Sequence, residues 1–276
     1  METKNVSDSN LEIIKPIGHD RPPLKAVLFD FDGTISTLRQ GWEEVMGPFM
    51  VEFICGNTKP ASDIIEEVYK YINESTGIQT IYQMEWLVEA VKRYGLNPNI
   101  LDKWSYKDEY NRRLMDRVKI RVDKLKKGEL KSADFMIKGA SEFLQVLYQK
   151  GIDIYVASGT DHTDVVNEAG ALGLCDYFTK IAGAPKRRAD CSKEAVLKEL
   201  IVEKGLKGEE LLVVGDGKVE ISLGAHMGAI TLGAATDEIK RFGVNSVKRD
   251  RLIKAGAHAI TGDFVNYRDI LGWIGL

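Results

Sequence analysis

Short apolar runs that end in Gly or an acid recur along the chain and predict buried strands. They occupy residues 25–32, 152–157, 177–181, 211–214 and 229–232, with a further candidate at 257–260. Runs of this length, without regular polar alternation, are typical of parallel strands that are covered on both faces. We therefore expect these segments to lie together in one parallel sheet.

Amphipathic stripes separate these runs and predict helices. The stripe at 143–148 is followed by similar stripes at 165–172 and 195–201. Strands that alternate with helices from residue 136 to 270 predict an α/β fold, in which a Rossmann-like parallel sheet carries helices on both faces. Ligands of such sheets bind at the carboxyl ends of the strands, so we expect the active site there.

Residues 36–135 contain no convincing strand and predict a separate all-helical domain. Apolar residues recur there at helical spacing in stripes at 42–54, 64–72 and 84–91, and 101–118 suggests one or two further helices. Because this periodicity is typical of a helix-bundle core, we assign the aromatic residues within it to packing. The predicted domains are a loosely ordered polar lead-in at 1–23, a sheet domain at 24–35 and 136–276, and a helical insertion at 36–135.

The composition is typical of a soluble globular protein, with 44% apolar and 29% charged residues. Thirty-eight Lys and Arg against 41 Asp and Glu leave a net charge of −3, so there is no basic excess to bind nucleic acid. The three cysteines form no CxxC pair, the apolar runs are too short to span a membrane, and the polar start does not resemble a signal peptide. We expect a cytoplasmic protein that binds neither nucleic acid nor a membrane.

The candidate chemistry begins directly after the first predicted strand, in Asp30-Phe31-Asp32-Gly33-Thr34. Two carboxylates at positions i and i+2 beyond a strand end can face one pocket, and Gly33 permits a tight turn. The alternative is a turn in which the acids only accept backbone hydrogen bonds. Because the motif follows an apolar run directly, we favour a functional site.

This motif resembles DxDG[TV], the first of four motifs in the haloacid dehalogenase-like hydrolase superfamily. The second motif is a Ser or Thr at the end of an apolar strand, and Ser158 meets it, with Thr160 as the alternative. The third is a basic residue near the start of a helix, for which Lys193 is the candidate and Lys186 the competitor.

The fourth motif, GDxxx[DE], is similar to the segment that contains Asp216 and Glu220, and Lys193 lies 23 residues before Asp216. The resemblance covers about 24–35 and 136–272, and the helical insertion is similar in position and character to the family's C1 cap. Within the superfamily the chain looks like the branch of phosphoglycolate phosphatase and β-phosphoglucomutase. It departs from that branch because its third motif lacks the common Lys-Pro.

The resemblance implies a Mg²⁺-dependent phosphatase that forms an aspartyl-phosphate. Asp30 would be the nucleophile and Asp32 the general acid and base, while Ser158 and Lys193 would hold the phosphoryl group during catalysis. The implied metal-binding residues, direct or through water, are Asp30, Asp32 through its backbone carbonyl, Asp216 and Glu220. The implied phosphate-binding residues are Gly33, Thr34, Ser158, Gly159 and Lys193.

The predicted substrate is a small phosphorylated metabolite, such as a sugar phosphate. Arg39, Trp42 and Glu43 follow the first motif closely enough to face it, although placement in the core or on the surface competes with this role. Arg187 and Arg188 precede the third motif and could bind a second anionic group, or lie in a solvated loop.

Two other functions compete with a phosphatase. A phosphomutase would use the same aspartyl-phosphate but return the phosphoryl group to a sugar. A non-catalytic metabolite-binding or partner-binding protein of this fold would have lost a motif acid, and none is lost. A dehalogenase is disfavoured because those relatives lack the second acid, Asp32 here. We assign none of the four histidines to catalysis, although His162 lies just past the second motif.

Overall fold

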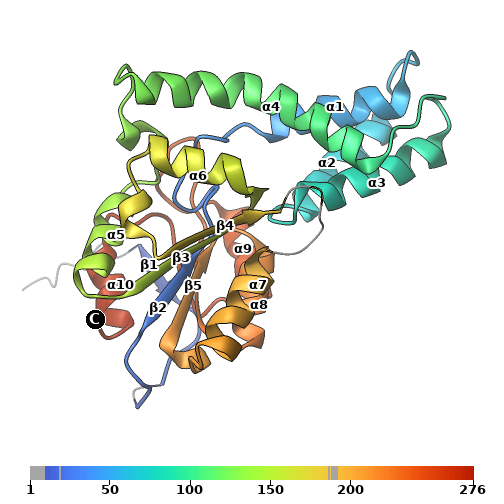
Figure 1. Cartoon of the computed structure of the whole chain (residues 1–276). Coiled ribbons are helices and arrows are strands. Elements are labelled where there is room, and N and C mark those ends of the chain that lie inside the picture. Colours follow the sequence, from blue (N-terminus) through green and yellow to red (C-terminus); the bar gives the residue numbers. More distant parts are fainter. Residues whose placement is uncertain (1–9, 19, 186, 188–191) are drawn as a thin grey trace, which may run out of the picture.

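The computed structural model describes residues 10–18, 20–185, 187 and 192–276 of the chain. Within these residues the core is a seven-stranded sheet in the order β1-β7-β6-β5-β2-β3-β4 (Figure 1). All neighbouring strands are parallel apart from β1 with β7, so the predicted parallel sheet is confirmed. The strands are β1 (Leu11–Ile13), β2 (Ala26–Phe29), β3 (Asp153–Asp161), β4 (Lys180–Ala184), β5 (Leu211–Gly215), β6 (Ile230–Ala234) and β7 (Ala259–Thr261).

Strand β2 lies between β3 and β5, and all four of its residues are buried. Its Leu28 pairs in register with Tyr155 of β3 and Val213 of β5. Because these three strands run parallel, their carboxyl ends meet at one edge of the sheet. The residues that follow them are therefore brought together there.

Strands β1 and β4 differ most from the prediction, and β3 runs on to Asp161, beyond the predicted end at residue 157. Strand β1 lies in the segment predicted as a loosely ordered lead-in, yet it pairs with β7. Unpaired backbone groups on the outer side of β7 can bind a short segment that no hydrophobic pattern marks. The predicted strand at 177–181 is wrong at its start, because Tyr177 ends a 3₁₀ turn and packs against Tyr148, and β4 begins only at Lys180.

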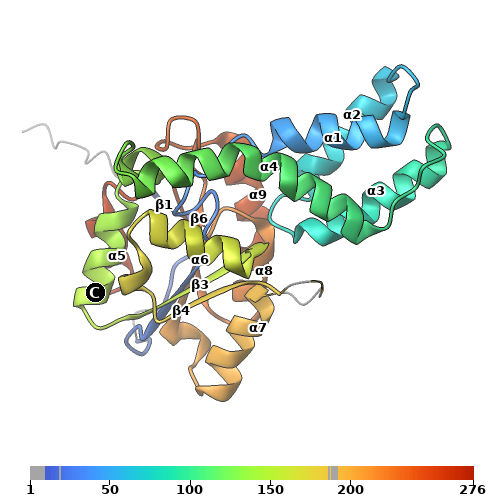
Figure 2. The ribbon, with the colours of Figure 1, turned by 45° about the horizontal axis from the view of Figure 1, so that its top comes forward.

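Helices cover both faces of the sheet, so the predicted α/β fold class is confirmed (Figures 1 and 2). Residues of α5, α6 and α10 share a buried cluster with Val27 and Phe29, whereas α7 and α8 pack against Ala26 and Leu28 on the opposite face. Helix α9 packs beside α8. The helices are α5 (Ala140–Gln149), α6 (His162–Ala171), α7 (Ser192–Lys198), α8 (Lys218–His226), α9 (Ser246–Ala255) and α10 (Tyr267–Trp273).

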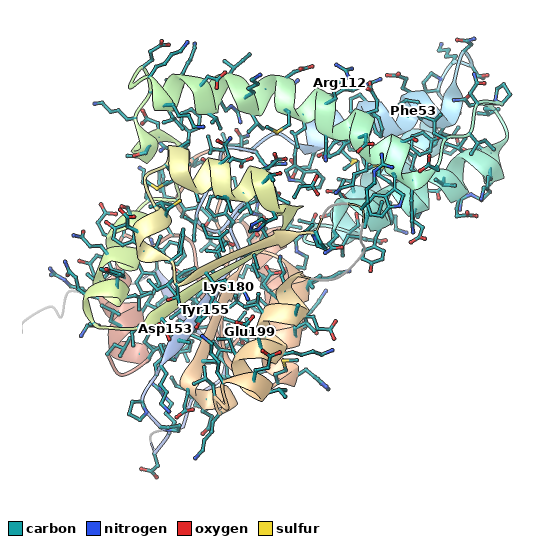
Figure 3. All side chains as sticks on the ribbon, in the orientation of Figure 1. Phe53, Arg112, Asp153, Tyr155, Lys180 and Glu199 are labelled. Carbon is teal, nitrogen blue, oxygen red and sulfur yellow. The ribbon has the colours of Figure 1, made fainter. Side chains whose placement is uncertain are left out.

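Short turns complete the sheet region. Helix α7 continues into a π-helical turn, whose Glu199 forms an ion pair with Lys180 of β4 (Figure 3). These turns are η1 (Ser132–Phe135), η2 (Cys175–Tyr177), η3 (Glu199–Glu203) and η4 (Gly208–Glu210).

The four helices between β2 and α5 form a helical layer at the end of the sheet where the strands stop (Figure 1). The single helix α4, capped by the side chain of Asp102, takes the place of the one or two helices expected around 101–118. The helices of this layer are α1 (Glu43–Cys55), α2 (Ser62–Glu74), α3 (Thr80–Tyr94) and α4 (Lys103–Lys126).

The predicted stripes of this helical segment form most of its core. Met46, Phe49 and Val68 are fully buried. Ile65 and Tyr69 lie on a predicted stripe but are 38% and 45% exposed. The stripe is therefore broader than the face that packs. None of the described helices is both long enough and apolar enough to cross a membrane.

The segments that enter and leave the helical layer run beside each other. The Thr37 N–H donates to the Phe135 carbonyl, and the Ile137 N–H donates to the Ile35 carbonyl, both at 2.9 Å. The helical layer and one face of the sheet also belong to a single buried apolar cluster. The two regions are thus joined by a packed core as well as by two linkers.

Candidate active site

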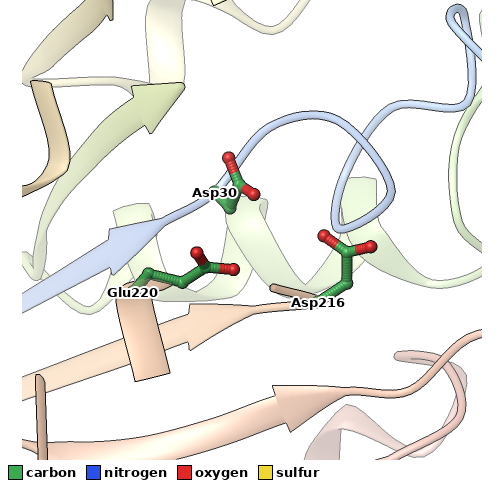
Figure 4. Close-up of side chains that lie close together, drawn as sticks. All are labelled: Asp30, Asp216 and Glu220. Atoms are coloured by element: carbon green, nitrogen blue, oxygen red, sulfur yellow. The ribbon is translucent and has the colours of Figure 1, made fainter. Parts of the chain in front are cut away.

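Three strand ends carry the principal predicted residues. Asp30 directly follows β2, Ser158 lies in the last part of β3, and Asp216 directly follows β5. Glu220 comes from the first turn of α8, one helical turn after Asp216. Figure 4 shows the carboxylates of Asp30, Asp216 and Glu220 turned toward a shared space. The parallel pairing of β2 with β3 and β5 therefore assembles residues that are far apart in the sequence.

Lys193 connects two of these acids. Its Nζ donates to Asp30 Oδ2 at 2.9 Å and to Glu220 Oε2 at 2.8 Å, and all three side chains are at most 6% exposed. Burial raises the pKa of Asp30 well above its usual value, against the effect of Lys193. Burial alone would lower the pKa of Lys193, but Asp30 and Glu220 outweigh it and raise that pKa. The competitor Lys186 lies outside the described residues.

The three acids could hold a metal ion. One carboxylate oxygen each from Asp30, Asp216 and Glu220 lie within 4.8 Å of one another. Hard divalent cations such as Mg²⁺ prefer carboxylate oxygen ligands, so the donor set fits such an ion. The Gly217 N–H donates to Glu220 Oε1 at 2.6 Å and orients that carboxylate.

Two glycines are required for this close approach of acids. A Cβ on Gly33 would lie 2.5 Å from Asp216 Oδ2, and a Cβ on Gly215 would lie 2.2 Å from Glu220 Oε1. Gly33 also has a φ of +74°, in the left-handed region that favours glycine. The Gly residues of the first and fourth motifs thus provide room for Asp216 and Glu220.

Asp32 lies beside the second motif. Its Oδ2 accepts hydrogen bonds from Ser158 Oγ at 3.2 Å and from Thr160 Oγ1 at 2.8 Å. Its Oδ1 has no hydrogen-bond partner among the described residues, and Arg39 Nε lies 3.9 Å away. Ser158 and its alternative Thr160 therefore both contact the second acid of the first motif.

Arg39 is held by the sheet domain. Its guanidinium binds the fully buried Glu168 of α6, with Nη2 2.6 Å from Oε1, and it also lies 3.4 Å from Asp164. Burial raises the pKa of Glu168 to about 7, although Arg39 opposes this shift. Arg39 therefore links the segment after the first motif to α6.

A cavity of about 380 Å³ lies between the strand ends and helices α1–α4. Two residues of the predicted motifs, Thr34 and Glu220, do not line this cavity. The Thr34 hydroxyl instead donates to Asp216 Oδ1 at 3.4 Å. The predicted residues that line it are Asp30, Asp32, Gly33, Arg39, Trp42, Glu43, Ser158, Gly159, Lys193 and Asp216.

Of the two arginines before the third motif, Arg187 lies within the described residues. Arg187 is exposed and forms an ion pair with Asp108 of α4 at 3.1 Å, and it does not line the cavity. Arg188 lies outside the described residues. The structure thus offers no contact between Arg187 and the predicted phosphate site.

Sequence reasoning missed a second lysine bridge. Lys248 of α9 donates to Asp216 Oδ2 at 2.7 Å and also binds Glu238, and its side chain is 13% exposed. Arg251 of the same helix donates to the Asp216 carbonyl at 3.1 Å. No sequence motif marks Lys248, which lies in the first turn of α9. The one signal that could have indicated this contact was an acid, Glu238, soon after the end of β6.

Comparisons with known proteins give the family of the chain and the likeness of its fold. A family model described as haloacid dehalogenase-like hydrolase matches residues 24–228. No curated protein matches the sequence. A predicted phosphoglycolate phosphatase from Haemophilus somnus 129PT has a TM-score of 0.62 at 16% identity, over 90% of this chain and 97% of that one. A β-phosphoglucomutase from Clostridium difficile has a TM-score of 0.61 at 15% identity, over 91% and 97%.

A third similar structure is a hydrolase from Pseudomonas syringae. It has a TM-score of 0.57 at 16% identity, and the alignment covers 90% of this chain and 99% of that chain. At such low identities these likenesses concern the fold. The family match rests on the sequence itself.

Proposed function

Because the chain belongs to the haloacid dehalogenase-like hydrolase family, we propose that it is a Mg²⁺-dependent phosphatase of a small phosphorylated metabolite. The observation that carries the proposal is the buried contact between Asp30 and Lys193, beside Asp216 and Glu220. A phosphate dianion repels a carboxylate, so a nucleophilic acid requires cationic groups around it. This site provides Lys193 beside Asp30, Lys248 beside Asp216, and candidate ligands for a metal ion.

In this proposal Asp30 is the nucleophile and Asp32 is the general acid and base. An oxygen of Asp30 attacks phosphorus and forms an aspartyl-phosphate, while the bond from phosphorus to the leaving oxygen breaks. Asp32 donates a proton to that oxygen and then accepts a proton from the water that hydrolyses the intermediate. The hydroxyls of Ser158 and Thr160 support this role, because they hold one Asp32 oxygen, and the other oxygen has no hydrogen-bond donor among the described residues.

The phosphoryl group would lie between Lys193 and the end of β3. In this proposal Lys193 donates to a phosphoryl oxygen, and Ser158 and Gly159, which line the same cavity, lie beside that group. Donors already in position at the developing charge lower the barrier without reorganisation. Mg²⁺ held by Asp30, Asp216 and Glu220 would supply the positive charge that lets an anionic nucleophile approach phosphate.

The test is Mg²⁺-dependent release of phosphate from p-nitrophenyl phosphate and from a panel of phosphorylated metabolites. We expect Asp30→Asn to lower kcat by at least about 1,000-fold, or ~4 kcal/mol of barrier, because the amide is a poor nucleophile. Lys193 keeps Glu220 as a partner in this variant, so the fold should persist in circular dichroism. A folded Asp30→Asn protein with a tenth of the wild-type kcat would contradict the proposal.

A phosphomutase is the second candidate, because a β-phosphoglucomutase has a similar fold. It would return the phosphoryl group from Asp30 to a sugar hydroxyl, with no net release of phosphate. Product analysis separates the two candidates, since a phosphorylated isomer favours the mutase and inorganic phosphate favours the phosphatase.

A further inference from the structure

Helices α1–α4 form the wall of the cavity opposite the strand ends, and this wall is polar. Glu43 is the only charged residue that these four helices contribute to the described lining. The wall contains no Lys, Arg or His from these helices among the described residues. Its other polar residues are Asn73, Thr80, Gln83, Tyr69 and Tyr110.

The Glu43 carboxylate has no side-chain partner among the described residues. Its side chain is accessible to solvent, and it forms no ion pair or hydrogen bond with another described residue. The neighbouring Glu44, by contrast, forms an ion pair with Arg117 at 3.2 Å. Partial desolvation and the nearby charges of Glu238 and Asp216 raise the pKa of Glu43, against the effects of its own backbone N–H and of Lys248. A cation in direct contact with Glu43 would therefore be stabilising.

Most cations of the cavity are already paired. Lys193 binds Asp30 and Glu220, Lys248 binds Asp216 and Glu238, and Arg39 binds Glu168. A second anionic group on a substrate would have to compete for them. An anion near Glu43 would also be repelled by its carboxylate.

Arg251 differs from the other cations of the cavity. It lines the cavity and forms no ion pair with a described acid, although it donates to the Asp216 carbonyl. It comes from α9, on the side of the sheet domain, and not from the wall of α1–α4. An anionic group would therefore have to bind at Arg251 and not at the Glu43 wall.

We propose that the leaving group of the substrate carries an ammonium group that binds Glu43. The substrate class would be phosphate monoesters of amino alcohols or amino sugars. This proposal rests on the proposed phosphatase function and names the substrate of that same site. When substrate fills the cavity, Glu43 loses hydration, and a cationic group offsets that loss where a neutral or anionic group does not.

The experiment compares three phosphates with a two-carbon leaving group that differ in charge at one position. They are O-phosphoethanolamine, 2-hydroxyethyl phosphate and 2-phosphoglycolate, which end in an ammonium, a hydroxyl and a carboxylate. Glucosamine 6-phosphate and glucose 6-phosphate form a larger matched pair. The readout is kcat/KM with Mg²⁺ and, for poor substrates, the inhibition constant against p-nitrophenyl phosphate hydrolysis. We expect each amino compound to be preferred at least 10-fold over its hydroxyl counterpart, and 2-phosphoglycolate to be the poorest.

Glu43→Gln tests the residue, because it removes the charge and keeps the size. We expect it to reduce the amino-to-hydroxyl ratio by at least 10-fold. Glu44→Gln is the matched control on the same helix and should retain the full wild-type ratio. A circular dichroism spectrum and melting temperature for each variant show that the fold is retained.

Three results would overturn the proposal. The first is equal kcat/KM and equal inhibition for the amino and hydroxyl compounds in the wild type. The second is an amino preference that survives in Glu43→Gln. The third is a preference for 2-phosphoglycolate that is lost in Arg251→Met, which would assign the cavity to anionic leaving groups. Absence of Mg²⁺-dependent hydrolysis of p-nitrophenyl phosphate would instead show that the phosphatase function itself is wrong.

Discussion

Charge pairing in a buried site is the main constraint on single residues at the strand ends. Asp30, Lys193 and Glu220 are at most 6% exposed and share one set of contacts. Removing Lys193 would leave two buried carboxylates without their cation, and breaking such a pair typically costs ~3–5 kcal/mol. Loss of activity in a Lys193 variant would therefore mix a catalytic effect with a loss of stability. The Asp30→Asn variant separates the two effects better, because Lys193 and Glu220 keep their ion pair.

Glu168 predicts a pH effect on stability at the residue scale. Burial raises its pKa to about 7 in the folded chain, against an ordinary value of 4.5. Between these values the folded protein holds a proton that the unfolded chain has released, so the stability that this group contributes falls as the pH rises through that range. The upper limit is ~3 kcal/mol, since each pKa unit corresponds to about 1.4 kcal/mol.

The measurement is urea unfolding of the wild type and Glu168→Gln from pH 4.5 to 8. The amide does not titrate, so the comparison cancels the effects of all other groups. We expect the wild type to lose up to ~3 kcal/mol relative to the variant as the pH rises through this range. A difference that stays flat or grows in favour of the wild type would mean that Arg39 dominates the ionisation of Glu168.

At the scale of elements, the turn from β5 into α8 predicts a strict need for glycine. A Cβ at Gly215 would lie 2.2 Å from Glu220 Oε1, so Gly215→Ala must displace that carboxylate or the strand end. Overpacking of this kind costs ~1–3 kcal/mol. We expect a lower melting temperature together with weaker Mg²⁺ binding by titration calorimetry.

Gly272 in α10 is the matched control. A Cβ there meets nothing within 4 Å, and its φ is not in the left-handed region. Gly272→Ala should therefore stabilise the helix by ~0.5–1 kcal/mol and leave Mg²⁺ binding unchanged. An equally harmless Gly215→Ala would contradict the packing argument at the site.

Helix α4 holds the helical layer against the sheet at the end of β3. Lys107 forms an ion pair with Asp161, and Asn111, one turn along, donates to the other oxygen of that carboxylate at 3.0 Å. Asp161 is the last residue of the strand that carries Ser158. The position of α4 is therefore coupled to the strand that contacts Asp32.

At the scale of the whole molecule, a metal ion should stabilise the fold. Acids from two strand ends and one helix converge at the site, and a bound cation offsets their repulsion. Ligand linkage gives ~2.7 kcal/mol of added stability at 100 times the dissociation constant. We expect Mg²⁺ to raise the melting temperature in a concentration-dependent way and EDTA to abolish phosphate release. Ca²⁺ should inhibit, because it takes more ligands at longer distances.

Asp216→Asn gives the corresponding variant, since it removes a candidate ligand charge. Its melting temperature should respond much less to Mg²⁺ than that of the wild type, whereas Glu44→Gln should respond fully. Identical melting curves in EDTA and in excess Mg²⁺, or full activity in chelator, would exclude the metal site.

The helical layer of α1–α4 is joined to the sheet by packing as well as by its two linkers. The two linkers are hydrogen-bonded to each other, and one apolar cluster continues from the sheet into α1–α4. Deleting residues 36–135 would expose part of that cluster. Recognition by this layer is therefore better tested with point variants of the full chain, such as Glu43→Gln, than with a truncated protein.

Several features of the fold and site could be predicted because their signal is local. The buried apolar run at 211–214 predicts a strand, and the apolar stripe at 42–54 predicts a helix, from the pattern of side chains alone. The motif acids Asp30 and Asp216 were found because each follows such a strand directly. The parallel sheet then requires them to meet at one edge.

The rest depended on contacts between distant segments, for which a single sequence carries no local pattern. β1 exists because β7 has a free edge, and Lys248 reaches Asp216 only because α9 packs beside the strand ends. Arg39 was a candidate to face substrate, with placement in the core or on the surface as the alternative. It lines the cavity, and Glu168, 129 residues further along, binds it. The sequence by itself determined the elements and the motif residues. Only the tertiary structure decided which charges are paired, and it left Glu43 without a side-chain partner in the part of the chain that it describes, because pairing is a property of three-dimensional proximity.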